Sequence, residues 1–165
     1  MQKKIKKVHR GFTLIELIVV IGLIGILSVI VLVSLTSAKN SSEDTSIQAN
    51  INKLQTQAEL YYSTYNNYGA NTSDYSSVCP TVSTASTTAG IMGMSGSGLL
   101  SFTTALVQRA GSINTLCTVS AQGTAWAVAV RLKGDTTKVA CADSTGKSKI
   151  SVTTLAGAIT SSACN

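Results

Sequence analysis

The sequence predicts an α+β fold in which one long N-terminal helix packs on a small antiparallel β-sheet. Three observations lead to this fold. An aliphatic run passes into a continuing helical periodicity, the last third of the chain alternates apolar and polar residues, and turn residues separate the alternating segments. The 165 residues suffice for one domain plus an appendage. The expected segments are residues 1–11, 12–38, 39–68, 69–114 and 115–165.

Residues 1–11 form a short basic segment. Five of the 13 Lys and Arg residues lie in the first ten positions, with no acidic residue among them. Outside this segment the two signs of charge nearly balance, so the net charge of +6 gives little support for a nucleic-acid-binding domain. His9, the one histidine of the chain, also lies here, which excludes histidine-based catalysis if the segment is removed.

Residues 12–38 are predicted to form an apolar helix. From Leu17 to Leu35 no residue is charged, and most residues are Leu, Ile or Val. This run is about 28 Å long as a helix, close to the roughly 30 Å hydrocarbon thickness of a bilayer. The preceding positive charges predict a cytoplasmic N-terminus and export of the rest of the chain. A secretory signal cleaved near residues 36–38 and an uncleaved membrane anchor both fit this pattern.

Residues 39–68 are predicted to continue the helix as an amphipathic segment. Apolar residues advance by three or four positions and form one stripe, made of Ile47, Ile51, Leu54, Ala58, Tyr61 and Tyr65. We therefore expect one helix from about residue 13 to about residue 66, with its second half covered by the remaining chain. The sequence Asn66-Asn67-Tyr68-Gly69 is the expected stop, with Gly69 as the left-handed cap.

Residues 69–114 are predicted to form a long Ser-, Thr- and Gly-rich connection with one short helix near residues 98–110. Residues 115–165 are predicted to form an antiparallel sheet of three or four strands. The clearest strand surrounds Trp126 and is expected to be half-buried, because apolar residues occupy every second position. The other strands are expected at residues 116–120, 137–143 and 149–153.

Glu16 stands at the start of the apolar run, where a carboxylate needs a partner. The segment from Gly11 to Glu16, GFTLIE, closely resembles the class III leader junction of type IV prepilins and pseudopilins. The resemblance implies a type IV pilin-like fold, cleavage between Gly11 and Phe12 by a prepilin peptidase, and N-methylation of Phe12. It also implies that Glu16 meets the terminal amine of a neighbouring subunit during assembly. Two alternatives stay open: Glu16 pairs with its own Phe12 amine, or it is protonated at the interface.

All four cysteines lie in the part expected to be exported, where disulfides form. Four cysteines allow three pairings, and the sequence does not choose among them. We favour Cys79–Cys117, which would hold the long connection, and Cys141–Cys164, which would fasten the C-terminus as terminal disulfides do in many pilins. The chain has no C-x-x-C motif, so we expect no metal site, and we expect no cofactor.

These residues predict a structural protein and not an enzyme. By the resemblance, the chain is a pilin, anchored in the cytoplasmic membrane as a single-pass precursor and then packed into an extracellular filament. Its expected partners are further copies of itself, other pilins, the prepilin peptidase, an inner-membrane assembly platform, and membrane lipid before assembly. The alternatives are a pseudopilin of a type II secretion or competence system and a secreted binding module with a conventional signal peptide. Nucleic-acid contact has no support beyond a few charged residues of the sheet, Arg131, Lys133, Lys138, Lys147 and Lys149.

Overall fold

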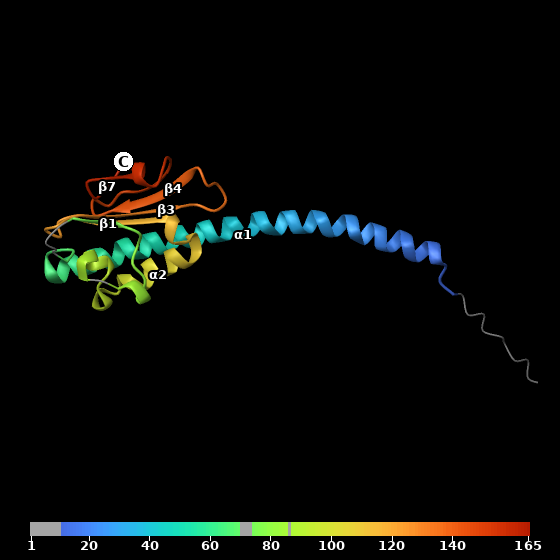
Figure 1. The fold of residues 1–165 in the computed structure, drawn as a ribbon, viewed down its shortest axis with the longest axis horizontal. Helices are drawn as coiled ribbons and strands as arrows, with labels where there is room; N and C mark the ends of the chain where they lie inside the picture. Colours follow the sequence, from blue (N-terminus) through green and yellow to red (C-terminus); the bar gives the residue numbers. More distant parts are fainter. Residues whose placement is uncertain (1–10, 70–73, 86) are drawn as a thin grey trace, which may run out of the picture. The chain divides into compact units, whose positions relative to one another are not determined.

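The computed structural model describes residues 11–69, 74–85 and 87–165 (Figure 1). It contains one long N-terminal helix, α1 (Leu14–Tyr65), and an antiparallel five-stranded sheet, so the predicted α+β fold class is confirmed. The chain divides into two compact units, an N-terminal unit that ends at Ala38 and a second unit that begins at Lys39. We call the second unit, residues 39–165, the head.

The head is built around the second part of α1. Four residues of the predicted stripe are 0% to 1% exposed: Ile47, Ile51, Leu54 and Ala58. The stripe was expected to reach Tyr65, and this was wrong, because Tyr65 is 59% exposed. Tyr65 packs on Tyr61 instead, with ring centroids 4.4 Å apart, so the last turn of the helix extends beyond the core that covers the stripe.

The helix ends at an asparagine and not at the expected glycine. Asn66 takes the left-handed conformation (φ 55°), and its N–H donates to the Tyr62 carbonyl at 2.7 Å. Asparagine tolerates this conformation better than most residues, so it can act as the cap. Gly69 is needed for a different reason: a Cβ at this position would lie 2.8 Å from the Ile91 nitrogen.

The five strands of the main sheet are all antiparallel and follow one another in chain order. They are β1 (Tyr75–Ser77), β2 (Thr115–Val119), β3 (Trp126–Arg131), β4 (Lys138–Asp143) and β5 (Ser148–Val152). Strands β2 to β5 and helix α2 (Leu99–Ala110) match the elements expected from the sequence. Strand β1 was not expected, and neither was the C-terminal hairpin of β6 (Ile159–Thr160) and β7 (Ala163–Cys164).

Both faces of the sheet are covered at its central strands, whereas β5 is mostly exposed. On one face Val128 and Val130 pack with the stripe of α1 and with α2. On the other face Ala127 and Ala129 pack against the C-terminal hairpin (Figure 1). The expectation of a half-buried β3 was therefore wrong: the hairpin covers the face that was taken to be exposed, and the small alanine side chains allow its close approach.

Two disulfides hold the head. Cys79–Cys117 joins the long connection to β2, and Cys141–Cys164 joins β4 to the last strand. This is the connectivity that the sequence analysis favoured. Each disulfide contributes about 2–4 kcal/mol to the stability of a small domain, so together they hold the two segments that carry the least regular structure.

Candidate functional site

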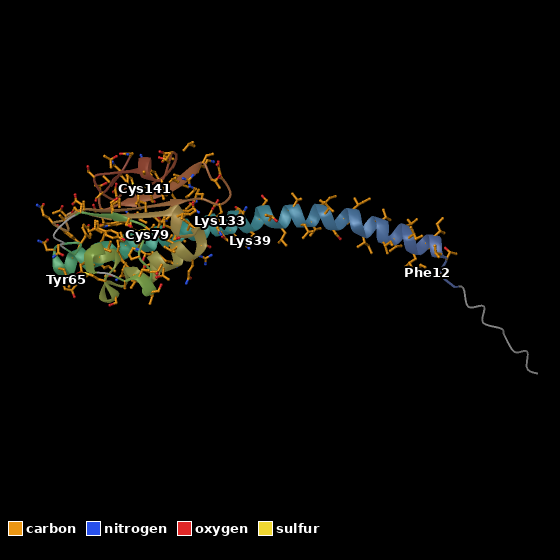
Figure 2. The ribbon with its side chains drawn as sticks, viewed as in Figure 1. Phe12, Lys39, Tyr65, Cys79, Lys133 and Cys141 are labelled. Atoms are coloured by element: carbon orange, nitrogen blue, oxygen red, sulfur yellow. A yellow bond between two sulfur atoms is a disulfide. The ribbon has the colours of Figure 1, made fainter. Side chains whose placement is uncertain are left out.

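The segment directly before α1, residues 11–13, is exposed. Gly11, Phe12 and Thr13 are not helical, and all three are exposed. Among the described residues, and leaving out its chain neighbours, no heavy atom lies within 4 Å of the position that a Cβ on Gly11 would occupy. The Phe12 side chain is 84% exposed (Figure 2). The Gly11–Phe12 peptide bond therefore lies in accessible, non-helical backbone of the kind that a protease can bind.

Thr13 and Glu16 form a reciprocal cap at the start of α1. The Thr13 backbone N–H and hydroxyl donate to Glu16 Oε2 at 2.9 Å and 2.8 Å. In return, the Glu16 backbone N–H donates to Thr13 Oγ1 at 3.3 Å. This is the capping box, in which a Thr and a Glu three residues later satisfy each other's backbone donors. The sequence analysis missed the role of Thr13, although the T-x-x-E spacing is the known signal for it.

The cap gives the Glu16 carboxylate a partner that the sequence analysis did not consider. Both Thr13 donors bind the same oxygen, Oε2, and within the described residues Oε1 accepts no hydrogen bond. Phe12 and Glu16 also line one shallow hollow at the start of the helix. One oxygen of Glu16 is thus engaged within the chain, while the other can accept a further donor.

The helix that follows this junction has no apolar cover in its own unit. From Phe12 to Leu35 its large apolar side chains are between 45% and 84% exposed. The helix also contains a stretch long and apolar enough to cross a membrane, and none of that stretch is buried. An aliphatic surface of this size is stable in lipid or against the apolar helices of other chains, and not in water.

The other candidate residues of the sequence have separate structural roles. The basic side chains noted in the sequence are divided, because Lys133 pairs with Glu43 and Lys138 with Asp135, while Lys147 lies in the turn at the other end of β4. All four cysteines are in disulfides. Across the described residues, no group of three or more His, Cys, Asp or Glu side chains is placed to hold a metal ion.

Comparison with known families gives a match at this same junction. Residues 6–32 match the prokaryotic N-terminal methylation motif, which is the signature of type IV pilins and pseudopilins. The match includes Gly11, Phe12, Glu16 and most of the apolar run, so the resemblance noted in the sequence is confirmed. No curated protein and no solved structure matches the chain significantly.

Proposed function

From the N-terminal methylation motif of type IV pilins and pseudopilins that this chain carries, we propose that the protein is a pilin, a structural subunit of a type IV pilus-like surface filament. The carrying observation is an accessible Gly11–Phe12 bond directly before a helix whose large apolar side chains are exposed as far as Leu35. The precursor spans the cytoplasmic membrane once and exports its head. Cleavage after Gly11 and methylation of Phe12 then prepare it for helix-to-helix packing.

Cleavage changes the charges at the start of the helix. It removes the five Lys and Arg residues that hold the N-terminus in the cytoplasm, and it creates a positive amine on Phe12. Apolar contacts alone favour a neighbouring helix little over lipid tails, because both surfaces are equally apolar. When this amine pairs with Glu16 of another subunit, the helix gains a reason to pack against a neighbouring helix and not against lipid. The same pairing fixes the axial position of one subunit relative to the next.

The geometry of Glu16 allows both of its partners at once. Oε2 is held by Thr13 of the same chain, and Oε1 can accept the incoming amine. Glu16 therefore does not have to break its cap when the subunit enters the filament. In the membrane-anchored precursor, the same cap provides the carboxylate with two hydrogen bonds before any neighbour is present.

The first experiment tests the junction. Mass spectrometry of the mature protein should find a methylated Phe12 at the N-terminus. Gly11→Val should leave the full-length precursor in the membrane, because the side chain blocks close approach of a protease to the backbone. The matched control is Gly22→Ala, since a Cβ at Gly22 meets no atom within 4 Å. Normal processing of Gly11→Val would show that the junction is assigned incorrectly.

The second experiment separates the charge of Glu16 from its cap. Glu16→Gln keeps an acceptor for the Thr13 donors and removes the charge, so it should be processed normally and form few filaments. Glu16→Ala should behave in the same way. Thr13→Val keeps the charge and loses the hydroxyl, so it should still form filaments, at a reduced yield. Abundant filaments from Glu16→Gln would show that amine pairing is dispensable.

A third measurement separates this proposal from its alternatives. Purified surface filaments that contain this chain as their main component support the pilin. Absence of the chain from surface filaments, together with a secretion or DNA-uptake defect when it is deleted, indicates a pseudopilin. A mature chain that begins at Lys39 would indicate a secreted binding module, because the apolar helix would then have been removed as a signal.

A further inference from the structure

The carboxylates of the head are all engaged inside the head. Each of the six Asp and Glu residues accepts a hydrogen bond or forms an ion pair within the described residues. They are Glu43, Asp44, Glu59, Asp74, Asp135 and Asp143. Most of the Lys and Arg side chains of the head, in contrast, form no ion pair within the described residues. Lys133 and Lys138 form ion pairs, whereas the other six Lys and Arg residues of the head form none with the described carboxylates. With eight Lys and Arg residues against six Asp and Glu residues, the head carries a net charge of +2, and most of its cations are free of ion pairs within the described residues.

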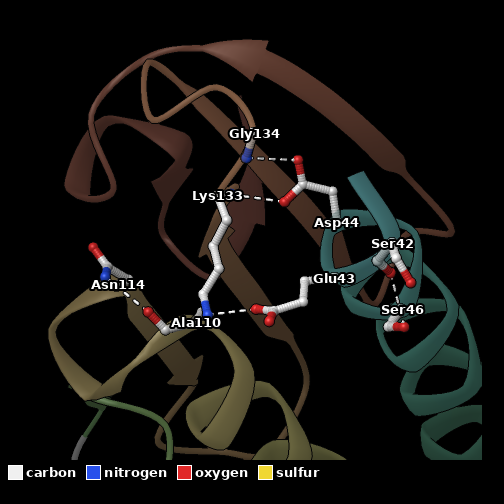
Figure 3. Close-up of polar contacts among 8 residues, drawn as sticks. All are labelled: Ser42, Glu43, Asp44, Ser46, Ala110, Asn114, Lys133 and Gly134. Atoms are coloured by element: carbon white, nitrogen blue, oxygen red, sulfur yellow. Dashed lines mark hydrogen bonds and ion pairs between the residues drawn. The ribbon is translucent and has the colours of Figure 1, made fainter. Parts of the chain in front are cut away.

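Part of this charge gathers where the chain enters the head. Lys133 forms an ion pair with Glu43 of α1 (Figure 3). Asp44 fastens the same turn, since Oδ1 accepts the Lys133 N–H at 2.7 Å and Oδ2 accepts the Gly134 N–H at 2.9 Å. The β3–β4 turn is thus held firmly against the first turns of the helix in the head.

Two further cations act on the same carboxylate. The ion pair with Lys133 lowers the pKa of Glu43 despite the partial burial of this residue, and the positive charges of Lys39 and Arg109 lower it further. Both of these side chains are exposed, and Arg109 lies in the last turn of α2. We call the surface formed by Lys39, Arg109, Ile113 and Lys133 the basal surface.

Ile113 gives the basal surface an apolar point. It lies in the short turn after α2, where the Asn114 side chain donates to the Ala110 carbonyl at 2.8 Å. Ile113 is 84% exposed, more than any other large apolar side chain in the described part of the head. Ile113 follows the exposed Arg109 by four residues. Exposed apolar and cationic side chains together favour binding to a membrane surface that carries anionic lipid.

Chain connectivity limits the distance between Lys39 and the bilayer. Lys39 follows Leu35, the last residue of the apolar run, by four residues of continuous helix. This is a distance of about 6 Å along the helix, and four residues span no more than about 14 Å when fully extended. A Debye length of about 8 Å applies at physiological ionic strength. Lys39 therefore lies within electrostatic reach of lipid headgroups whenever the helix spans the membrane.

We propose that the basal surface binds anionic phospholipid headgroups of the membrane that anchors the chain, with Lys39 and Arg109 at the phosphates and Ile113 inserted between headgroups. The inference rests on the membrane anchor of the proposed function. A second copy of the head is a poorer partner, because it carries the same excess of eight Lys and Arg residues over six Asp and Glu residues. The contact holds the head on the membrane before assembly and is released when the subunit leaves lipid.

The test uses the full chain reconstituted in vesicles. Ile113→Trp provides a reporter whose fluorescence is quenched by brominated lipid, and the unmodified chain gives the background because Trp126 is 0% exposed. Quenching should be stronger in vesicles that contain phosphatidylglycerol than in phosphatidylcholine alone, and salt should weaken it. Adding Arg109→Gln should lower the ratio of bound to free head about fivefold. Adding Lys147→Gln, which removes a cation at the other end of β4, should leave it unchanged.

The outcomes separate this contact from the anchor. Vesicle flotation first shows whether the chain is in the membrane, and a chain that does not float refutes the anchor and the contact together. A chain that floats, with equal quenching in the two lipids, refutes the contact and leaves the anchor standing. Quenching that follows the protein-to-lipid ratio and ignores phosphatidylglycerol would assign the basal surface to a second copy and overturn the proposal.

Discussion

Replacing Asp143 by asparagine should destabilise the head strongly, although the two side chains have nearly the same size. Asp143 lies at the end of β4 and is 0% exposed. Its Oδ1 accepts the Thr145 N–H at 2.8 Å, the Thr145 hydroxyl at 2.6 Å and, more weakly, the Lys147 N–H at 3.4 Å. Its Oδ2 accepts the Cys164 N–H at 2.7 Å. One carboxylate thus closes the β4–β5 turn and holds the C-terminal strand.

The expected loss in the free energy of unfolding follows from the donors that bind Asp143. Asparagine has one acceptor oxygen, so either the Thr145 side or the Cys164 N–H meets an NH₂ group and loses its bond. A buried donor without a partner costs about 1–3 kcal/mol, and the remaining bonds weaken because hydrogen bonds to a charged group are worth about 1 kcal/mol more than neutral ones. Asparagine regains part of this loss because no charge is desolvated. We expect the free energy of unfolding to fall by about 2–4 kcal/mol.

The same carboxylate predicts a pH dependence. Burial alone would raise the pKa of Asp143, but the hydrogen bonds from Thr145, Cys164 and Lys147 outweigh it and hold the pKa below its ordinary value. An unfolded aspartate titrates near pH 3.9. A lowered folded pKa means that the stabilisation is complete above about pH 4 and is lost as the pH falls through the folded pKa. The difference in the free energy of unfolding between the wild type and Asp143→Asn should therefore become smaller as the pH falls below about 4.

The assay is thermal unfolding of the full chain in detergent, with the disulfides oxidised, followed by fluorescence of the one tryptophan, the buried Trp126. The midpoint should fall by about 6–16 °C. Asp135→Asn is the matched control. Asp135 likewise accepts hydrogen bonds from a residue two positions later, the N–H of Thr137 at 3.0 Å and its hydroxyl at 2.6 Å. Its turn is more exposed than that of Asp143. Equal shifts for the two variants would refute the role given to burial and to Cys164.

Two further changes test the packing of the head. Gly90→Ala should destabilise the head by about 1–3 kcal/mol, because φ at Gly90 is +54° and the new Cβ would lie 2.8 Å from the Gly69 oxygen. The control Gly96→Ala should be neutral, since a Cβ at Gly96 would meet no atom within 4 Å. Equal denaturation midpoints for the two variants would contradict this packing. Cys141→Ser with Cys164→Ser opens a loop of sequence separation 23 and should lower the unfolding free energy by about 3 kcal/mol, measured by denaturant titration. An unchanged midpoint would show that the Asp143 contact holds the C-terminus without the disulfide.

The elements that the sequence predicted are those with a regular apolar pattern. Helix α1 and strand β3 carry such patterns over many residues, so their type and place could be found without the structure. Strand β1 consists of Tyr75, Ser76 and Ser77 and has no pattern of its own. It forms because β2 offers a free edge and the disulfide from Cys79 brings the connection to it, and both causes lie far away in the sequence.

The burial of β3 shows the same limit. Its alternating side chains predicted one buried and one exposed face, and a two-residue strand such as Ile159–Thr160 gives no sign that it will cover the second face. The capping box at the start of α1, by contrast, could have been predicted from the sequence. The pair Thr13 and Glu16 has the spacing of a capping box, but attention to the charge of Glu16 alone left the threonine unexplained.

The cap explains how a glutamate at the start of an apolar helix can serve both the lone precursor and the filament that we propose. A free glutamate side chain samples many rotamers, and a contact that fixes it must offset the lost entropy. In this chain Thr13 already fixes Glu16 by two hydrogen bonds to Oε2, while Oε1 accepts none within the described residues. An incoming amine therefore meets a carboxylate that is already ordered, and the pairing loses less side-chain entropy than it would with a mobile glutamate. By this reasoning the threonine acts on assembly through the glutamate, without contacting the neighbouring subunit.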